Sequence, residues 1–175
     1  MTDDLRYPTG PFKYDPHVTP DTRKQAIAAI RDAPSALRSA VRGLSDTQLN
    51  TPYRDGGWTV RQVAHHVPES HMNAFIRFKL AMTEDNPTIK PYDENAWANL
   101  ADVPREPIET SLALLDALHH RWTTLLEAMT PDDFARTLVH PEMGQRTLDF
   151  MLQMYAWHGR HHTAHVTSLR TRKGW

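Results

Sequence analysis

The chain has 175 residues, of which 39% are hydrophobic, and its 20 Lys and Arg nearly balance its 21 Asp and Glu. A chain of this length buries roughly two-thirds of its unfolded surface, so we expect a single domain over residues 1–175. The net charge of −1 provides no field that attracts nucleic acid, and the lack of cysteine excludes disulfides, thiolate nucleophiles and cysteine-based zinc sites.

The first 20 residues are predicted to form an extended arm. They contain four prolines, each of which fixes φ and biases the preceding residue away from the helix. From Asp21 to about Gly43, apolar residues recur at helical spacing and predict the first helix. Pro34 lies in the middle of this helix, and we expect it to kink or split the helix.

Three further apolar periods predict helices over residues 59–82, 112–129 and 148–169. Residues 84–106 contain three prolines without a clear period and predict a long loop between the second and third helices. No strand is predicted. The fold class is therefore all-α: a four-helix bundle with a proline-rich extended arm and one long loop, whose ligand sites would project inward from facing helices.

No apolar run of signal-peptide length opens the sequence, and no run of 18 apolar residues occurs in it. We therefore expect a cytoplasmic protein with neither a membrane nor a nucleic acid as partner.

The segment YAWHGRHHTAHV, residues 155–166, contains four histidines. A helix turns about 100° per residue, which places His162 in the middle of the buried stripe and His158 about 40° to one side. This i, i+4 spacing puts both imidazoles on one inward face, where they either share an ion or are core histidines satisfied by hydrogen bonds. His161 lies about 100° from His162 and is expected on the exposed face, and His165, at about 60°, is expected near the mouth of a cavity.

An open zinc site usually has three protein ligands, so a third residue is required. The second predicted helix offers His65, His66 and His71. His65 lies about 160° from the apolar stripe and should face solvent, whereas His66 lies about 100° from it. His71 is nearer the stripe, so helical geometry leaves both His66 and His71 as candidates.

Four runs of the sequence resemble the YfiT group of DinB-like proteins, described as metal-dependent hydrolases, and the resemblance extends over nearly the whole chain. The runs are LNTPYRDGGWTVRQVAHHV, SHMNAFIRFKLAMTEDNPTIKPYDENAW, LHHRW and YAWHGRHHTAHV. The resemblance implies a four-helix bundle in which three histidines bind a divalent metal, usually zinc or nickel. It assigns the ligands to His66, eight residues after Trp58, and to His158 and His162.

The sequence is also similar to enzymes that transfer low-molecular-weight thiols such as bacillithiol or mycothiol, and the resemblance implies a homodimer. One feature departs from the family pattern. Pro68 lies two residues after His66, where an interior proline can kink the helix and could displace this ligand.

A divalent ion held by three neutral imidazoles keeps its full charge and can activate water or a thiol. We therefore expect one divalent metal per chain, with zinc favoured and nickel, manganese or iron compatible. The predicted function is metal-dependent hydrolysis of a small molecule. Metal-dependent thiol S-transfer is one alternative, and a non-catalytic metal-binding protein, its site closed by His71 or Glu69, is another.

Two further residues share the side of the second helix that carries His66. Glu69 is the candidate catalytic residue, able to orient an imidazole or to accept a proton, although a solvated carboxylate is the simpler interpretation. Arg77 has no acidic neighbour at i±4 and could bind a substrate carboxylate or phosphate. Tyr92 and Trp97 of the long loop are predicted either to cap the site or to anchor the loop.

Overall fold

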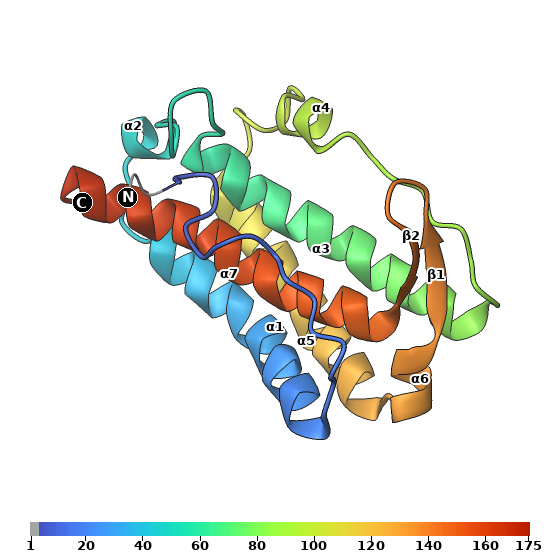
Figure 1. Ribbon diagram of the computed structural model, residues 1–175. Coiled ribbons are helices and arrows are strands. Elements are labelled where there is room, and N and C mark those ends of the chain that lie inside the picture. Colours follow the sequence, from blue (N-terminus) through green and yellow to red (C-terminus); the bar gives the residue numbers. More distant parts are fainter. Residues whose placement is uncertain (1–3) are drawn as a thin grey trace.

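The structure is a computed structural model that describes residues 4–175. Its body is a bundle of four long helices (Figure 1). These are α1 (Pro20–Val41), α3 (Val60–Thr83), α5 (Ile108–Ala128) and α7 (Leu148–Lys173). The predicted all-α four-helix bundle is therefore confirmed, with boundaries within a few residues of the expected ones.

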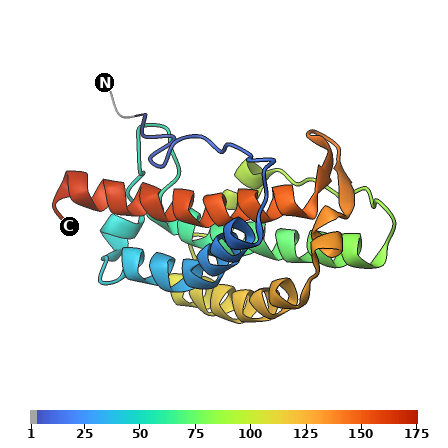
Figure 2. The same ribbon diagram turned by 60° about the horizontal axis from the view of Figure 1, so that its bottom comes forward.

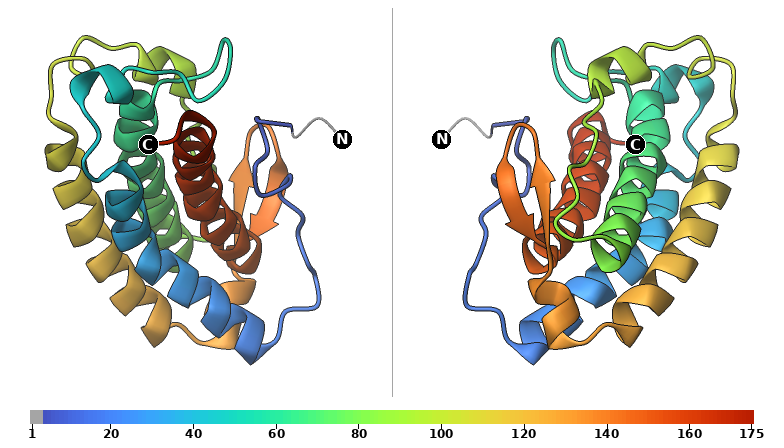
Figure 3. Two further views of the ribbon diagram at one scale, coloured as in Figure 1. Left: turned by 90° about the vertical axis from the view of Figure 1, so that its left-hand side faces the viewer. Right: turned by 90° about the vertical axis from the view of Figure 1, so that its right-hand side faces the viewer.

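In the bundle, α1 and α3 lie on opposite sides and each packs against both α5 and α7 (Figure 3). Helices α1 and α7 run parallel, because Arg23 bonds Asp149 near their N-termini and Arg170 bonds the Ala40 carbonyl near their C-termini. Helices α3 and α5 also run parallel to each other. Their connection, residues 84–107, must therefore return along the full length of the bundle, which explains the long predicted loop.

Side-chain caps define where the helices begin. Thr19 and Thr59 accept from the backbone N–H three residues on and close capping boxes at the N-termini of α1 and α3. Both helices continue through an internal proline, Pro34 in α1 and Pro68 in α3. The predicted split of the first helix at Pro34 is therefore wrong.

The prediction that the chain forms no strands was wrong. Strands β1 (Thr137–His140) and β2 (Gly144–Thr147) form an antiparallel hairpin before α7. Strands of four residues are too short to show a period, and Gly144, with φ of +72°, supports the turn. Three short helices were also not predicted: α2 (Asp46–Leu49), α4 (Glu94–Ala98) and α6 (Pro131–Ala135).

The N-terminal arm passes along the outer side of α7, as Figure 2 shows. The indole N–H of Trp157 donates to the Gly10 carbonyl, and Gln153 exchanges two hydrogen bonds with the backbone of Asp15. Phe12 packs edge-on against Phe150. The arm is thus extended, as predicted, and it covers one face of a helix.

The core has two apolar clusters, one toward each end of the bundle. Phe78 and Trp122 belong to the first, and Leu37 and Val63 to the second. Along α3, α5 and α7, buried histidines occupy the positions between these clusters. Within the described residues no helix is both long and apolar enough to span a membrane.

Candidate metal centre

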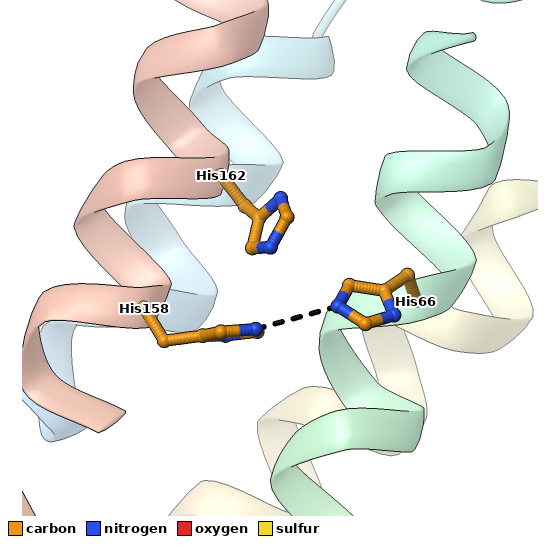
Figure 4. Close-up of side chains that lie close together, drawn as sticks. All are labelled: His66, His158 and His162. Carbon is orange, nitrogen blue, oxygen red and sulfur yellow. Dashed lines mark hydrogen bonds between the residues drawn. The ribbon is translucent and has the colours of Figure 1, made fainter. Parts of the chain in front are cut away.

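Three histidines from two antiparallel helices meet at the level between the two apolar clusters of the core. Helix α3 supplies His66, and α7 supplies His158 and His162 one turn apart (Figure 4). One ring nitrogen from each residue lies within 4.8 Å of the others. The structure thus brings together the three residues that the sequence singled out, and Pro68 does not displace His66.

One of the separations between these nitrogens matches that of two ligands on a divalent ion. In a tetrahedral zinc site with Zn–N distances of about 2.0–2.1 Å, ligand nitrogens lie about 3.3–3.4 Å apart. The Nε2 atoms of His66 and His158 are separated by 3.3 Å. The donor set, three imidazoles without a thiolate, suits zinc and several other divalent ions equally.

Burial keeps the three imidazoles neutral, which metal binding requires. Desolvation lowers the pKa of His66 to about 4. It lowers the pKa values of His158 and His162 well below the ordinary value, and the neighbouring histidines lower them further. No proton therefore has to be displaced from these rings at neutral pH.

The cluster forms part of the wall of a cavity of about 470 Å³. The buried Arg77 also lines this cavity, and its guanidinium donates to the Tyr155 hydroxyl and to the Lys90 carbonyl, both at 3.2 Å. Both acceptors are neutral, so the charge of Arg77 is not balanced by these contacts. The wall of the cavity thus combines a three-histidine cluster with a buried cation.

The loop that precedes α5 contributes to the same cavity. Tyr92 lines it, and burial raises the pKa of its phenol to about 12, so the group remains a hydrogen-bond donor. Its ring packs 4.5 Å from Trp97, which anchors it. The indole of Trp58 donates to Asn95 and packs edge-on over His66. The two predicted roles of the loop aromatics are thus divided between Tyr92, which lines the cavity, and Trp97, which holds Tyr92.

Two predictions of exposure were wrong. His65 is only 5% exposed because α5 covers it, and its Nδ1 lies 2.7 Å from the Ser111 hydroxyl. His161 is also buried, since the arm brings Tyr7 over it and its ring stacks on Trp157. His165 lines the cavity as expected. Periodicity within one helix could not reveal the burial of His65 and His161, because the segments that cover them come from elsewhere in the chain.

The structure does not support the role predicted for Glu69. This half-buried residue is not among those lining the cavity. Burial and the nearby Asp102 raise the pKa of its carboxyl group. The catalytic role of Glu69 stays a prediction without geometric support.

His71 is no fourth ligand, because both of its ring nitrogens already face protein partners. Its Nδ1 lies 2.7 Å from Nε2 of His119, and its Nε2 lies 3.0 Å from Nδ1 of His158. Sequence reasoning assigned no role to His119. The only signal for it was the run LHHRW, which the family resemblance included without a function.

The fold and the cluster together define a class: helical-bundle proteins with a three-histidine centre suited to a divalent metal. The chain belongs to the DinB superfamily, whose family model matches residues 29–166. Two curated relatives bear the name "Putative metal-dependent hydrolase". One, from Bacillus mycoides (strain KBAB4), is 55% identical over 172 residues. The other, from Bacillus cereus (strain B4264), is 54% identical, and each alignment covers 98% of this chain and 99% of the relative.

Among solved structures, the chain is similar to YfiT from Bacillus subtilis, described as a probable metal-dependent hydrolase with an unusual four-helix bundle topology. The TM-score is 0.95 at 47% identity, and 98% of each chain is covered. The four-helix bundle protein TT2238 matches with a TM-score of 0.57 at 22% identity, over 87% of this chain and 99% of that one. The second similarity concerns the fold alone.

Proposed function

We propose that the protein is a metal-dependent hydrolase in which His66, His158 and His162 hold one zinc ion. The observation that carries the proposal is the convergence of three neutral imidazoles on the wall of a cavity. The names of the relatives support the same class of activity. A bound divalent ion would supply Lewis acidity that activates water for attack on a substrate.

The residues around the cluster favour a catalytic centre over a structural one. A structural zinc site is closed by a fourth protein ligand. Within residues 4–175 the cluster contains no carboxylate, and the ring nitrogens of His71 are taken by other histidines. The three histidines line the cavity, where a small molecule would have room beside a bound ion.

A buried arginine in the cavity wall indicates the kind of substrate. Arg77 is buried, and its two hydrogen bonds go to neutral oxygens, so a substrate carboxylate or phosphate would be its natural counter-ion. Tyr92 offers a further hydrogen-bond donor. We therefore propose a small anionic substrate with a hydrolysable bond placed at the histidine cluster.

The first experiment is elemental analysis of untagged protein by plasma mass spectrometry. We expect about one metal ion per chain in the wild type, and its loss in His66→Ala and His162→Ala with helical circular dichroism retained. The matched control is His65→Ala, a buried histidine of the same helix that bonds Ser111 outside the cluster. Absence of bound metal, even after incubation with zinc, would contradict the proposal.

The second experiment separates hydrolysis from thiol transfer. The zinc-loaded protein is assayed with small anionic esters, amides and phosphoesters, with and without a low-molecular-weight thiol. Turnover in water alone supports hydrolysis. Turnover that requires both the thiol and an electrophile would replace hydrolysis with S-transfer at the same site, and metal binding without either activity would indicate a binding protein.

A further inference from the structure

We propose that His71 and His119 are positioning residues that hold the metal ligand His158 in the correct tautomer. They do so through a chain of hydrogen bonds that starts at a backbone carbonyl of α1 and ends at the cluster. The inference rests on the proposed metal site, although its primary measurement uses metal-free protein.

The chain begins at a carbonyl that a proline leaves without its usual donor. Pro34 has no N–H, so the carbonyl of Ile30, four residues earlier, lacks its helical hydrogen bond. The Nδ1 atom of His119 lies 2.5 Å from this oxygen, and both residues are buried. A carbonyl oxygen can only accept, so the hydrogen of the His119 ring is on Nδ1.

The tautomers of the next two rings follow from this assignment. In a neutral His119 with its hydrogen on Nδ1, Nε2 is an acceptor, so Nδ1 of His71 at 2.7 Å must donate. Nε2 of His71 is then an acceptor, and Nδ1 of His158 at 3.0 Å must donate to it. Nε2 of His158 is left as an acceptor, 3.3 Å from Nε2 of His66 and 3.5 Å from the Ser70 hydroxyl.

Burial supports the neutral state of His119, the ring that fixes the direction of the chain. This side chain is 1% exposed, and desolvation lowers its pKa to about 4. Protonation of His119 would turn its Nε2 into a second donor and reverse the direction of the chain, so the neutral state of this ring sets the tautomers of His71 and His158.

Packing fixes the orientation of His71. Its ring is stacked on His119, with centroids 4.9 Å apart, and lies edge-on to Trp122 and Tyr155. Gly159 lies beside it: a Cβ at this position would be in ordinary van der Waals contact with Cε1 of His71 at 3.5 Å and would lie only 3.1 Å from the Cβ of Ala33. The ring therefore has little freedom to rotate away from His158.

The relay gives His158 a feature that metal-binding histidines usually have. Their second ring N–H commonly donates to a protein acceptor, and loss of that acceptor typically weakens metal affinity 10–100-fold. Here the acceptor is another imidazole, itself held in place by His119. By contrast, Nδ1 of His162 is buried without a hydrogen-bond partner among the described residues.

The test begins with nitrogen-15 NMR of the histidine side chains in metal-free wild-type protein. We expect His158, His71 and His119 each to carry a hydrogen on Nδ1 and none on Nε2. His71→Leu removes the acceptor, so we expect His158 to populate both tautomers and zinc affinity, measured by chelator competition, to fall about 10–100-fold. The matched control His65→Leu, also buried on α3, should change that affinity by no more than about twofold.

A hydrogen on Nε2 of His158 in the metal-free wild type would overturn the relay, whatever the variants do. An unchanged tautomer and affinity in folded His71→Leu would overturn it as well. His119→Leu interrupts the hydrogen-bond chain one ring further from the metal cluster. We expect this variant to lose less zinc affinity than His71→Leu. If the protein bound no zinc, the proposed function would fail, whereas the NMR tautomers would still decide the relay.

Discussion

Two groups of histidines differ in what their ring nitrogens face. The cavity-facing group is His66, His158 and His162, and the inner group is His71 and His119. The ring nitrogens of His66, His158 and His162 converge on one point beside the cavity. The rings of His71 and His119 are more deeply buried, and their nitrogens face each other, His158 and a backbone carbonyl. A depressed pKa is common to both groups and does not distinguish them. The partners of the nitrogens do.

The largest predicted effect comes from breaking the packing of the inner group. Trp122 is fully buried and packs against His71, His119 and Phe78. We expect Trp122→Ala to reduce the free energy of unfolding by about 3–5 kcal/mol, measured by urea denaturation. The exposed Leu114 on the same helix is the control, and Leu114→Ala should cost about 0.5 kcal/mol or less. Similar losses in both variants would contradict the role of Trp122 in the core.

The next predicted effect is a dependence of the protein's stability on pH. An unfolded histidine binds a proton near pH 6.5, whereas burial lowers the pKa of His119 in the folded protein to about 4. Between these values the unfolded chain binds more protons, so stability falls as the pH is lowered from about 6.5 toward 4 and is unaffected by this group above pH 7.

Urea midpoints of metal-free protein, measured from pH 4.5 to 7.5, check this prediction. His119→Gln should reduce the slope of this dependence while the other buried histidines keep their contributions, whereas His120→Gln, a change at the exposed neighbour, should leave it as in the wild type. A midpoint that did not decrease on acidification would show that the inner group is not held neutral.

A smaller effect sharpens the distinction between the metal cluster and substrate recognition in the cavity. Arg77→Met keeps the apolar stem and removes the charge, so we expect zinc content to stay unchanged. The KM for an anionic substrate should rise about tenfold or more, because a hydrogen bond to a charged group contributes about 1.5–3 kcal/mol. A neutral analogue should show little change.

The control for this experiment is Arg31→Met, which removes an exposed arginine that pairs with Glu127 on another face of the bundle. Equal effects on the anionic and neutral substrates, or a loss of zinc, would show that Arg77 supports the fold and not the substrate.

The smallest effect is expected from Pro34→Ala. An alanine N–H would offer the Ile30 carbonyl a helical donor, in competition with Nδ1 of His119. A carbonyl has two lone pairs and can accept from both, so we expect zinc affinity to change by no more than about threefold. Chelator competition measures it. A loss as large as that of His71→Leu would mean that the proline shapes the site in some other way.

Much of the fold was predictable because long helices leave a period in the sequence. The four long helices and the long loop were anticipated, whereas the hairpin before α7 was not, since its strands have only four residues each. Within the site, the inward direction of His158 and His162 followed from helical spacing, and the family resemblance selected His66. The burial of His65 and His161 was missed, because α5 covers one and the arm covers the other.

The sequence by itself determined the class of the protein: a helical bundle without cysteine, with an inward pair of histidines one turn apart on its last helix. Such features depend on residues that are near each other along the chain, and helical geometry relates them directly. Only the tertiary structure decided that His71 supports a candidate ligand and is not one itself. That distinction depends on α1, α3, α5 and α7 meeting at one level of the bundle, where a carbonyl left free by Pro34 lies beside His119.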